Sequence, residues 1–230
     1  ETTTSYTLTV VAYTSSDTVS ADMTITITNV NDESPSDMAL SAASAAENAA
    51  AGDDIGTLST TDGDASGNSH VYTLVTDSGG ATAYSGTDFA LDSAVLEVGS
   101  SPSFDYETTT SYTVYVKVAD GSNTAYVEGF TISITDVNDN SPTDMALSAA
   151  SAAEDASAGD DIGTLSTTDG DASGNSHVYT LVTDSGGATA YSGTNFALDS
   201  AVLEVGCSPS FAYETKTYYP VYVKVADGSN

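Results

Sequence analysis

Residues 130–142 read Phe-Thr-Ile-Ser-Ile-Thr-Asp-Val-Asn-Asp-Asn-Ser-Pro, a strand-like stretch followed at once by a run of oxygen-bearing side chains. In the first half, apolar residues alternate with polar ones, which is the period of a β-strand with one buried face. Residues 29–35 form a second oxygen-rich run, Asn-Val-Asn-Asp-Glu-Ser-Pro. We call residues 29–35 and 136–142 the first and second seams, because a repeated sequence begins at the proline that ends each of them.

The repeat has a register of 107 residues, which is the difference between Pro142 and Pro35. Residues 35–123 and 142–230 align without a gap and differ at nine of 89 positions. This period suits a whole domain and exceeds the roughly 20–50 residues of a solenoid repeat, so we expect each copy to bury its own core. We interpret the chain as an excerpt from a longer array. It is expected to hold the last two strands of a preceding repeat in residues 1–34, a complete repeat in 35–141 and a repeat without its last strand in 142–230.

Charge narrows the classes of partner. The chain has 33 Asp and Glu residues, three Lys and no Arg, which gives a formal net charge of −30. No basic patch can form, so the sequence argues against a nucleic-acid or anionic-membrane partner and favours cations. The alternative for the bulk of this charge is a solvated acidic surface, as in proteins of saline habitats. A single cysteine, Cys207, excludes a disulfide within the chain.

The clearest predicted strands, residues 112–118 and 130–135, lie near the end of the complete copy. Further candidates are 54–59, 71–76, 89–91 and 95–98, separated by Gly- and Ser-rich breaks. Residues 38–51 are ambiguous, because their richness in Ala favours a helix whereas their alternating Met, Leu and Ala fit an opening strand. With that strand counted, the copy has seven short strands and is expected to form an all-β, antiparallel, immunoglobulin-like sandwich. In the second copy Pro220 replaces Thr113, which places this position at a strand start, an edge or a bulge.

Each copy also carries an acidic doublet in a glycine-rich segment: residues 61–68 read Thr-Asp-Gly-Asp-Ala-Ser-Gly-Asn, and residues 168–175 read the same. In an extended chain Asp62 and Asp64 point the same way, and two close carboxylates repel unless a cation lies between them. Carboxylate, carboxamide and carbonyl oxygens suit Ca²⁺, which takes about six to eight of them, whereas zinc would need His or Cys, which are nearly absent. The pattern therefore predicts sites for a hard cation at the doublets and the seams, where Ca²⁺ accepts flexible geometry and Mg²⁺ demands a tighter octahedron.

Taken together, these residues resemble the cadherin repeat. The resemblance covers residues 35–141 and nearly all of 142–230, and it rests on motifs in the order and spacing of that family: Ala46-Glu47-Asn48, Asp62-Gly63-Asp64, Phe89-Ala90-Leu91-Asp92, Phe104-Asp105-Tyr106-Glu107, Val118-Ala119-Asp120-Gly121 and Asp136-Val137-Asn138-Asp139-Asn140. The Arg-free, Ala-, Ser- and Thr-rich composition is similar to that of cadherin-like repeats in microbial surface proteins. The resemblance implies tandem seven-stranded Greek-key sandwiches with a cluster of Ca²⁺ ions at each junction between repeats.

The resemblance also implies ligands. For the junction between the two copies these come from the first copy, the second seam and the second copy, and they are Glu47, Asp105, Glu107, Asp136, Asn138, Asp139, Asn140, Asp169, Asp171, Asn175 and Asp227. For the first junction they are Glu1, Asn31, Asp32, Asp62, Asp64, Asn68 and Asp120. In the first seam Asn29 and Glu33 replace an Asp and an Asn of the second, so we expect weaker occupancy there. Glu154 and Glu214 would serve a following junction, where Ala212 stands in place of Asp105.

The function that follows is mechanical. We expect Ca²⁺ to clamp neighbouring repeats into a stiff, extracellular rod for cell adhesion, and the parent protein to be secreted or membrane-anchored at the cell surface. The partners are other cadherin-like repeats, in the same chain or in trans, and homophilic contact is left open. Strand exchange anchored by Trp is not supported, because the chain has no Trp.

Catalysis is not expected. No Gly-x-Ser-x-Gly motif is present, no small-molecule substrate is implied, and His70 and His177 fit a structural or surface role. The alternatives to an adhesive rod are a passive stalk of a larger secreted or surface protein and a carbohydrate-binding module.

Overall fold

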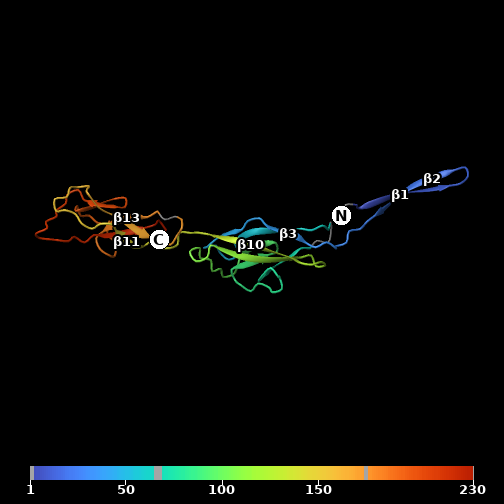
Figure 1. Ribbon diagram of the computed structural model, residues 1–230, viewed down its shortest axis with the longest axis horizontal. Coiled ribbons are helices and arrows are strands. Elements are labelled where there is room, and N and C mark those ends of the chain that lie inside the picture. The colour runs from blue at the N-terminus through green and yellow to red at the C-terminus, as the bar shows by residue number, and fades with distance from the viewer. Residues whose placement is uncertain (1–2, 65–68, 174–175, 230) are drawn as a thin grey trace. The chain divides into compact units, whose positions relative to one another are not determined.

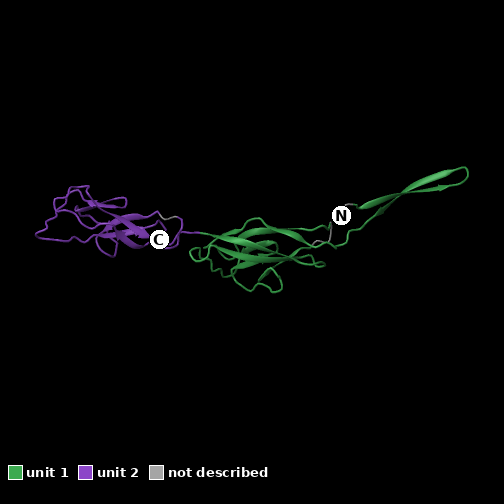
Figure 2. Cartoon of the chain, in the orientation of Figure 1, with its two compact units in different colours: residues 1–135 green, residues 136–230 purple. Residues whose placement is uncertain are grey.

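The computed structural model describes residues 3–64, 69–173 and 176–229. The chain divides into two compact units, residues 1–135 and 136–230, which we call unit 1 and unit 2 (Figure 2). The described residues form β-strands and no α-helix, which confirms the all-β prediction. Accordingly, this part of the chain contains no helix with the length and apolar character needed to span a bilayer.

Unit 1 contains two four-stranded sheets. One has the order β3 (Ser36–Leu40), β5 (Asp54–Thr61), β8 (Val95–Val98) and β7 (Phe89–Asp92). The other has the order β4 (Ser44–Ala46), β10 (Tyr126–Thr135), β9 (Ser111–Ala119) and β6 (Val71–Val75). Neighbouring strands run antiparallel except β4 and β10, which are parallel. β10, the last strand of the repeat, therefore pairs with β4 at the edge of its sheet.

Residues 38–51, which are ambiguous in the sequence, form strand and loop rather than helix. The expected opening strand is divided, with β3 in one sheet and β4 in the other, so eight described strands stand where seven are predicted. A close backbone approach explains this division. A Cβ on Gly56 in β5 would lie 2.4 Å from the carbonyl oxygen of Ala42, between β3 and β4. Glycine at position 56 lets the chain cross β5 there, and the other predicted strands correspond to β5–β10.

The core of unit 1 lies between the two sheets and takes side chains from both. Leu96 of β8, Val116 and Val118 of β9 and Ile132 of β10 have no exposed surface, and Ile134 is 3% exposed. The alternation predicted for β9 and β10 is confirmed, because every second residue of the buried stretch faces inward. Burying one Ile side chain contributes about 1.5–3 kcal/mol, so β10 is a large part of what stabilises this unit.

Unit 2 repeats one sheet of unit 1 and part of the other. The four-stranded sheet has the order β11 (Thr143–Leu147), β12 (Asp161–Thr168), β15 (Val202–Val205) and β14 (Phe196–Asp199). The opposing sheet has β13 (Val178–Val182) and β16 (Tyr222–Ala226), and no described strand of unit 2 matches β4 or β10. In repeat register β9 begins at the counterpart of Tyr218, yet β16 begins at Tyr222, because the intervening residues lack a partner strand. Pro220, expected at a strand start, an edge or a bulge, lies two residues before β16 and outside it.

Residues 5–26 form a β-hairpin of β1 (Ser5–Tyr13) and β2 (Thr18–Thr26), the two strands expected in residues 1–34 (Figure 1). The strands pair antiparallel from Ser5 opposite Thr26 to Tyr13 opposite Thr18, and they pair with no other described strand. Every residue of both strands is exposed. An isolated two-stranded hairpin is marginally stable in water, so this pair lacks the burial that holds its counterparts β9 and β10.

Candidate metal-binding sites

Each unit brings three aspartates together at the ends of its strands. In unit 1 the group consists of Asp62, Asp64 and Asp120. Each offers one carboxylate oxygen, and these three oxygens lie within 4.8 Å of one another. The matching group in unit 2 is Asp169, Asp171 and Asp227. The doublet follows β5 or β12, and the third aspartate directly follows β9 or β16. The second aspartate of each doublet and the third aspartate are at most 5% exposed, so four carboxylates are buried in these two groups.

A second acidic group of unit 1 consists of Glu47, Asp105 and Glu107, whose carboxylate oxygens also lie within 4.8 Å of one another. Glu47 directly follows β4 and is 8% exposed. Its Oε2 accepts a hydrogen bond of 2.7 Å from the backbone N–H of Tyr106. Asp105 accepts hydrogen bonds from the backbone N–H and the hydroxyl of Thr108. The parallel pairing of β4 with β10 thus holds Glu47 beside the loop that carries the other two carboxylates.

The corresponding region of unit 2 is less complete. Glu154 accepts a hydrogen bond of 2.9 Å from the backbone N–H of Tyr213, as Glu47 does from Tyr106, but Glu154 is exposed. Ala212 stands where the first copy has Asp105, and no described strand corresponds to β4. The described part of unit 2 therefore lacks a carboxylate at the position of Asp105, and it lacks the strand after which the buried Glu47 stands in unit 1.

The second seam is hydrogen-bonded to the doublet loop of unit 2. Asp171 accepts the backbone N–H of Asn140 at 3.1 Å and its side-chain amide at 3.0 Å. Asp136 accepts the backbone N–H groups of Ala172 at 3.1 Å and Ser173 at 2.7 Å, and also the Ser173 hydroxyl. Two predicted seam residues, Asp136 and Asn140, are thus held against the predicted doublet, and their oxygen atoms lie around one loop.

The first seam makes a similar contact through a residue that the sequence reasoning missed. The backbone N–H of Glu33 donates to Asp64 at 3.0 Å. The side-chain amide of Asn123 donates to Asn31 Oδ1 at 2.6 Å, to the Glu33 carbonyl at 2.7 Å and to Asp120 Oδ2 at 2.8 Å. Asn123 thereby ties the seam to the third aspartate. The available signal was its place at the end of the Asp-Gly-Ser-Asn turn, which follows β9 and recurs after β16.

The two histidines also lie beside the doublets. His70 Nε2 is 3.2 Å from Asp62 Oδ2, and His177 Nε2 is 3.0 Å from Asp169 Oδ2. The hydrogen bond from His177 lowers the pKa of Asp169. The sequence predicts a structural or surface role for both histidines but not this contact, which orients the first carboxylate of each doublet. The recurrence of the histidine at one position of the repeat was the signal for it.

The remaining predicted ligands have less defined positions. Asp32 and Asn138 lie in the first and second seams, outside the three carboxylate groups above. The backbone N–H of Asp139 lies 3.4 Å from Asp171 Oδ1. Three predicted ligands fall outside the described residues, namely Glu1, Asn68 and Asn175.

The donor chemistry of these groups fits a hard divalent cation. The members of each group are carboxylates, and beside each doublet a histidine Nε2 contacts the Oδ2 atom of its first aspartate. Three carboxylates this close repel one another, and a cation bound among them removes the repulsion. Ca²⁺ accepts such oxygen donors in flexible geometry, whereas zinc and the softer metals favour nitrogen and sulfur. The residues present therefore fit Ca²⁺.

Acid is expected to weaken metal-free unit 1. Hydrogen bonds from the backbone and side chain of Asn123, and from the backbone of Ser122, lower the pKa of Asp120 to about 2. An aspartate in an unfolded chain has a pKa of about 3.9, so this stabilisation is complete above that pH and is lost as the pH falls through about 2. Urea midpoints measured in chelator should fall over this range, and Asp120→Asn should flatten the fall. Asp92→Asn, an exposed control in β7, should leave it unchanged; equal slopes in both variants would contradict the assignment.

Comparison with known proteins assigns the fold. No protein-family model and no curated protein sequence matches the chain. Mouse clustered PcdhgC3 EC1-3 matches with a TM-score of 0.64 and 22% identity over 96% of this chain and 70% of that one. The human Desmocollin-1 ectodomain matches with a TM-score of 0.63 and 18% identity, over 98% and 45%. The Protocadherin GammaB4 extracellular domain matches with a TM-score of 0.56 and 21% identity, over 96% and 34%.

The chain has the fold of cadherin repeats. The resemblance read from the sequence motifs is confirmed at the level of fold, and identities this low carry the likeness no further. The cadherin-like chain spans about a third of the Protocadherin GammaB4 structure and less than half of the Desmocollin-1 ectodomain. Within each cadherin-like unit, the aspartate groups follow the ends of the strands that the motifs predicted.

Proposed function

We propose that this chain binds Ca²⁺ at the junctions between successive cadherin-like repeats, and that the bound ions stiffen an extracellular array used in cell adhesion. The observation that carries the proposal is the pair of matching aspartate groups, one in each unit, with buried carboxylates and with a seam hydrogen-bonded to the doublet. Solved structures with this fold are an extracellular domain and an ectodomain by their own descriptions. The proposal gives the chain no catalytic role.

The proposed ligands at the junction between the two copies come from three places in the sequence. The first copy supplies Glu47, Asp105 and Glu107; the seam supplies Asp136, Asn138, Asp139 and Asn140; and the second copy supplies Asp169, Asp171, Asn175 and Asp227. Without Ca²⁺ these acidic groups repel, and the seam leaves the repeats free to swing. Bound Ca²⁺ would neutralise them, and because it binds the ordered state it would also stabilise the folded units.

The first junction should bind Ca²⁺ more weakly than the second. Asn29 supplies no carboxylate where the second seam has Asp136, and Glu33 stands where the second seam has Asn140. At the second seam Asp136 accepts two backbone hydrogen bonds from the doublet loop, so it orders that loop as well as adding charge. A calcium titration of the chain should therefore resolve at least two classes of site.

Calorimetry and X-ray scattering test the proposal together. Ca²⁺ is expected to bind in the range of about 0.1–1 mM that is typical of extracellular modules, and equal Mg²⁺ should not displace it. The maximum dimension of the chain should rise on binding and fall again in chelator. Absence of binding up to about ten times that concentration would overturn the proposal. Binding without any change in scattering would contradict the proposed stiffening, and the chain would then be a spacer that Ca²⁺ stabilises.

A further inference from the structure

The side-chain amide of Asn123 lies at a point in unit 1 on which three oxygen atoms converge. Its Nδ2 is 2.6 Å from Asn31 Oδ1, 2.7 Å from the Glu33 carbonyl oxygen and 2.8 Å from Asp120 Oδ2. An NH2 group has two hydrogens, so it cannot donate a full hydrogen bond to each of three acceptors. The three oxygens are also closer than the roughly 2.9–3.0 Å that is usual for an amide donor. They are therefore arranged as they would be around a small cation.

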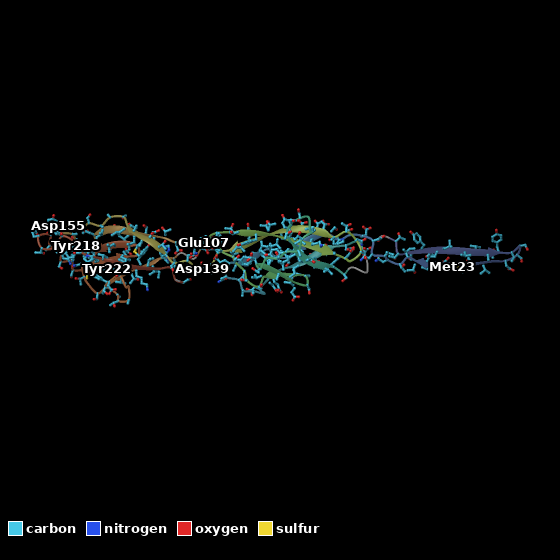
Figure 3. All side chains as sticks on the ribbon, turned by 90° about the horizontal axis from the view of Figure 1, so that it is seen from below. Met23, Glu107, Asp139, Asp155, Tyr218 and Tyr222 are labelled. Atoms are coloured by element: carbon cyan, nitrogen blue, oxygen red, sulfur yellow. The ribbon has the colours of Figure 1, made fainter. Side chains whose placement is uncertain are left out.

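The orientation of the Asn123 carboxamide follows from the same contacts. Turning the group over would place its oxygen against three acceptors, so the nitrogen is the end that fits. The second seam offers a comparison within the chain. There the side-chain amide of Asn140 donates to Asp139 Oδ1 at 3.2 Å and to Asp171 Oδ1 at 3.0 Å, which are ordinary lengths; Asp139 is labelled in Figure 3. The oxygens thus crowd Asn123 more closely than they crowd an amide of the other seam.

Ca²⁺ fits the position of the Asn123 amide nitrogen but cannot share it. Ca²⁺ takes oxygen ligands at about 2.3–2.6 Å, so the same three oxygens would move inward by only a few tenths of an ångström. A carboxamide, a carbonyl and a carboxylate oxygen are all ligands that Ca²⁺ accepts. The NH2 group of an amide is a donor with no lone pair to offer the ion. The side chain would therefore have to move away before the ion could bind among these oxygens.

We propose that Asn123 is an internal competitor of Ca²⁺ at the first junction: its amide bridges Asn31 and Asp120 in the metal-free chain and must leave when the ion binds. This inference rests on the proposed calcium binding and adds how one of its sites is regulated. Asp120 keeps its orientation when the side chain leaves. The backbone N–H groups of Ser122 and Asn123 each donate to its Oδ1 at 2.9 Å, and these bonds do not involve the carboxamide.

Competition fixes the sign of the effect that Asn123 has on calcium binding. A state in which the amide occupies the site raises the apparent dissociation constant, because only the remaining molecules are competent to bind. Removing the side chain removes that state, so calcium binding should become tighter while the metal-free seam becomes less ordered. A purely structural Asn123 would have the opposite effect, because loss of order in the seam would weaken the binding.

Asn123→Ala tests the proposal in calcium titrations that are followed by backbone amide NMR signals. The N–H of Glu33 reports on the first seam and that of Asn140 on the second, since each donates to an aspartate of the adjoining doublet. The dissociation constant measured at Glu33 should fall at least about 5-fold, the factor that corresponds to one ordinary hydrogen bond. The value at Asn140 should not change. Ser122→Ala, which truncates the neighbouring side chain of the same turn, should leave both values unchanged.

Hydrogen exchange of the unmodified chain supplies a second measurement. In chelator the side-chain amide of Asn123 should exchange more slowly than that of the exposed Asn48, and it should lose this protection as Ca²⁺ saturates the Glu33 signal. An unchanged or weaker calcium affinity in Asn123→Ala, or an amide that stays protected at saturation, would overturn the inference and leave calcium binding intact. If neither Glu33 nor Asn140 responds to Ca²⁺ at about ten times the concentration typical of extracellular modules, the proposed function falls and this inference falls with it.

Discussion

Asp171→Asn is expected to remove most of the calcium-dependent stabilisation of unit 2. Asp171 is 4% exposed and belongs to the Asp169 and Asp227 group, so a neutral amide there leaves the cation without one buried carboxylate. A ligand at about 100 times its dissociation constant raises the free energy of unfolding by about 2.7 kcal/mol. For a domain of this size that corresponds to roughly 10–20 °C in melting temperature. The variant should lose most of that shift.

The comparison is made between melting curves in Ca²⁺ and in chelator. Without metal, Asp171→Asn should change stability little, because relief of repulsion among three carboxylates offsets weaker hydrogen bonds to the Asn140 amides. Asp199→Asn, at an exposed position of β14, makes the same change of charge outside the group and should keep the full calcium shift. A calcium shift of equal size in both variants would show that Asp171 is not a ligand.

Unit 2 is expected to unfold well before unit 1 in the metal-free chain. Ile132 and Ile134 of β10 are buried in unit 1, and each contributes about 1.5–3 kcal/mol, whereas unit 2 has an open apolar groove of about 530 Å³ on the side where unit 1 holds β10. We therefore expect the free energy of unfolding of unit 2 to be lower than that of unit 1 by at least about 3 kcal/mol. The two copies differ at only nine of 89 aligned positions, so sequence differences contribute little to this gap.

Hydrogen exchange at low protein concentration, in chelator, can measure this difference with a built-in control. Residues 115–119 and 222–226 both read Tyr-Val-Lys-Val-Ala, so their intrinsic exchange rates match. The flanking residues Thr113 and Pro220 differ, so peptides from the two strands have different masses. The amides of β16 should exchange at least about 100-fold faster than those of β9 if opening follows global stability. Equal protection of the two strands would show that the open groove does not lower the stability of unit 2.

The strands were largely predictable because their signal is local. In β9 and β10 a two-residue alternation marks the buried face directly, and residues 54–59 and 95–98 are bounded by glycine- and serine-rich turns. The division of the opening strand into β3 and β4 was not predictable in this way. It depends on the approach of Ala42 to Gly56, two segments that meet only after β5 has paired.

The residues of the candidate sites also fall into those that a local pattern predicts and those that it does not. The doublets could be predicted from the sequence, since residues two apart in an extended segment point the same way. Asp120 and Asp227 were implied by the resemblance to the cadherin repeat. Asn123 and the two histidines could not, because their contacts join segments that lie apart in the sequence. His70 contacts Asp62, eight residues earlier in the chain, and Asn123 contacts Asn31, 92 residues earlier.

The parallel pairing of β4 with β10 sets an order of events during synthesis. Residues 44–46 pair with residues 133–135, so β4 has no partner strand until Thr135 has been synthesised, 89 residues after Ala46. At about 5–20 residues per second this interval lasts roughly 4–18 s. A repeat of this kind therefore closes only when its last strand emerges. Until that strand is synthesised, the preceding repeat already contains a last strand of nearly the same sequence. Each repeat must therefore pair with its own last strand faster than it pairs with that of the preceding repeat.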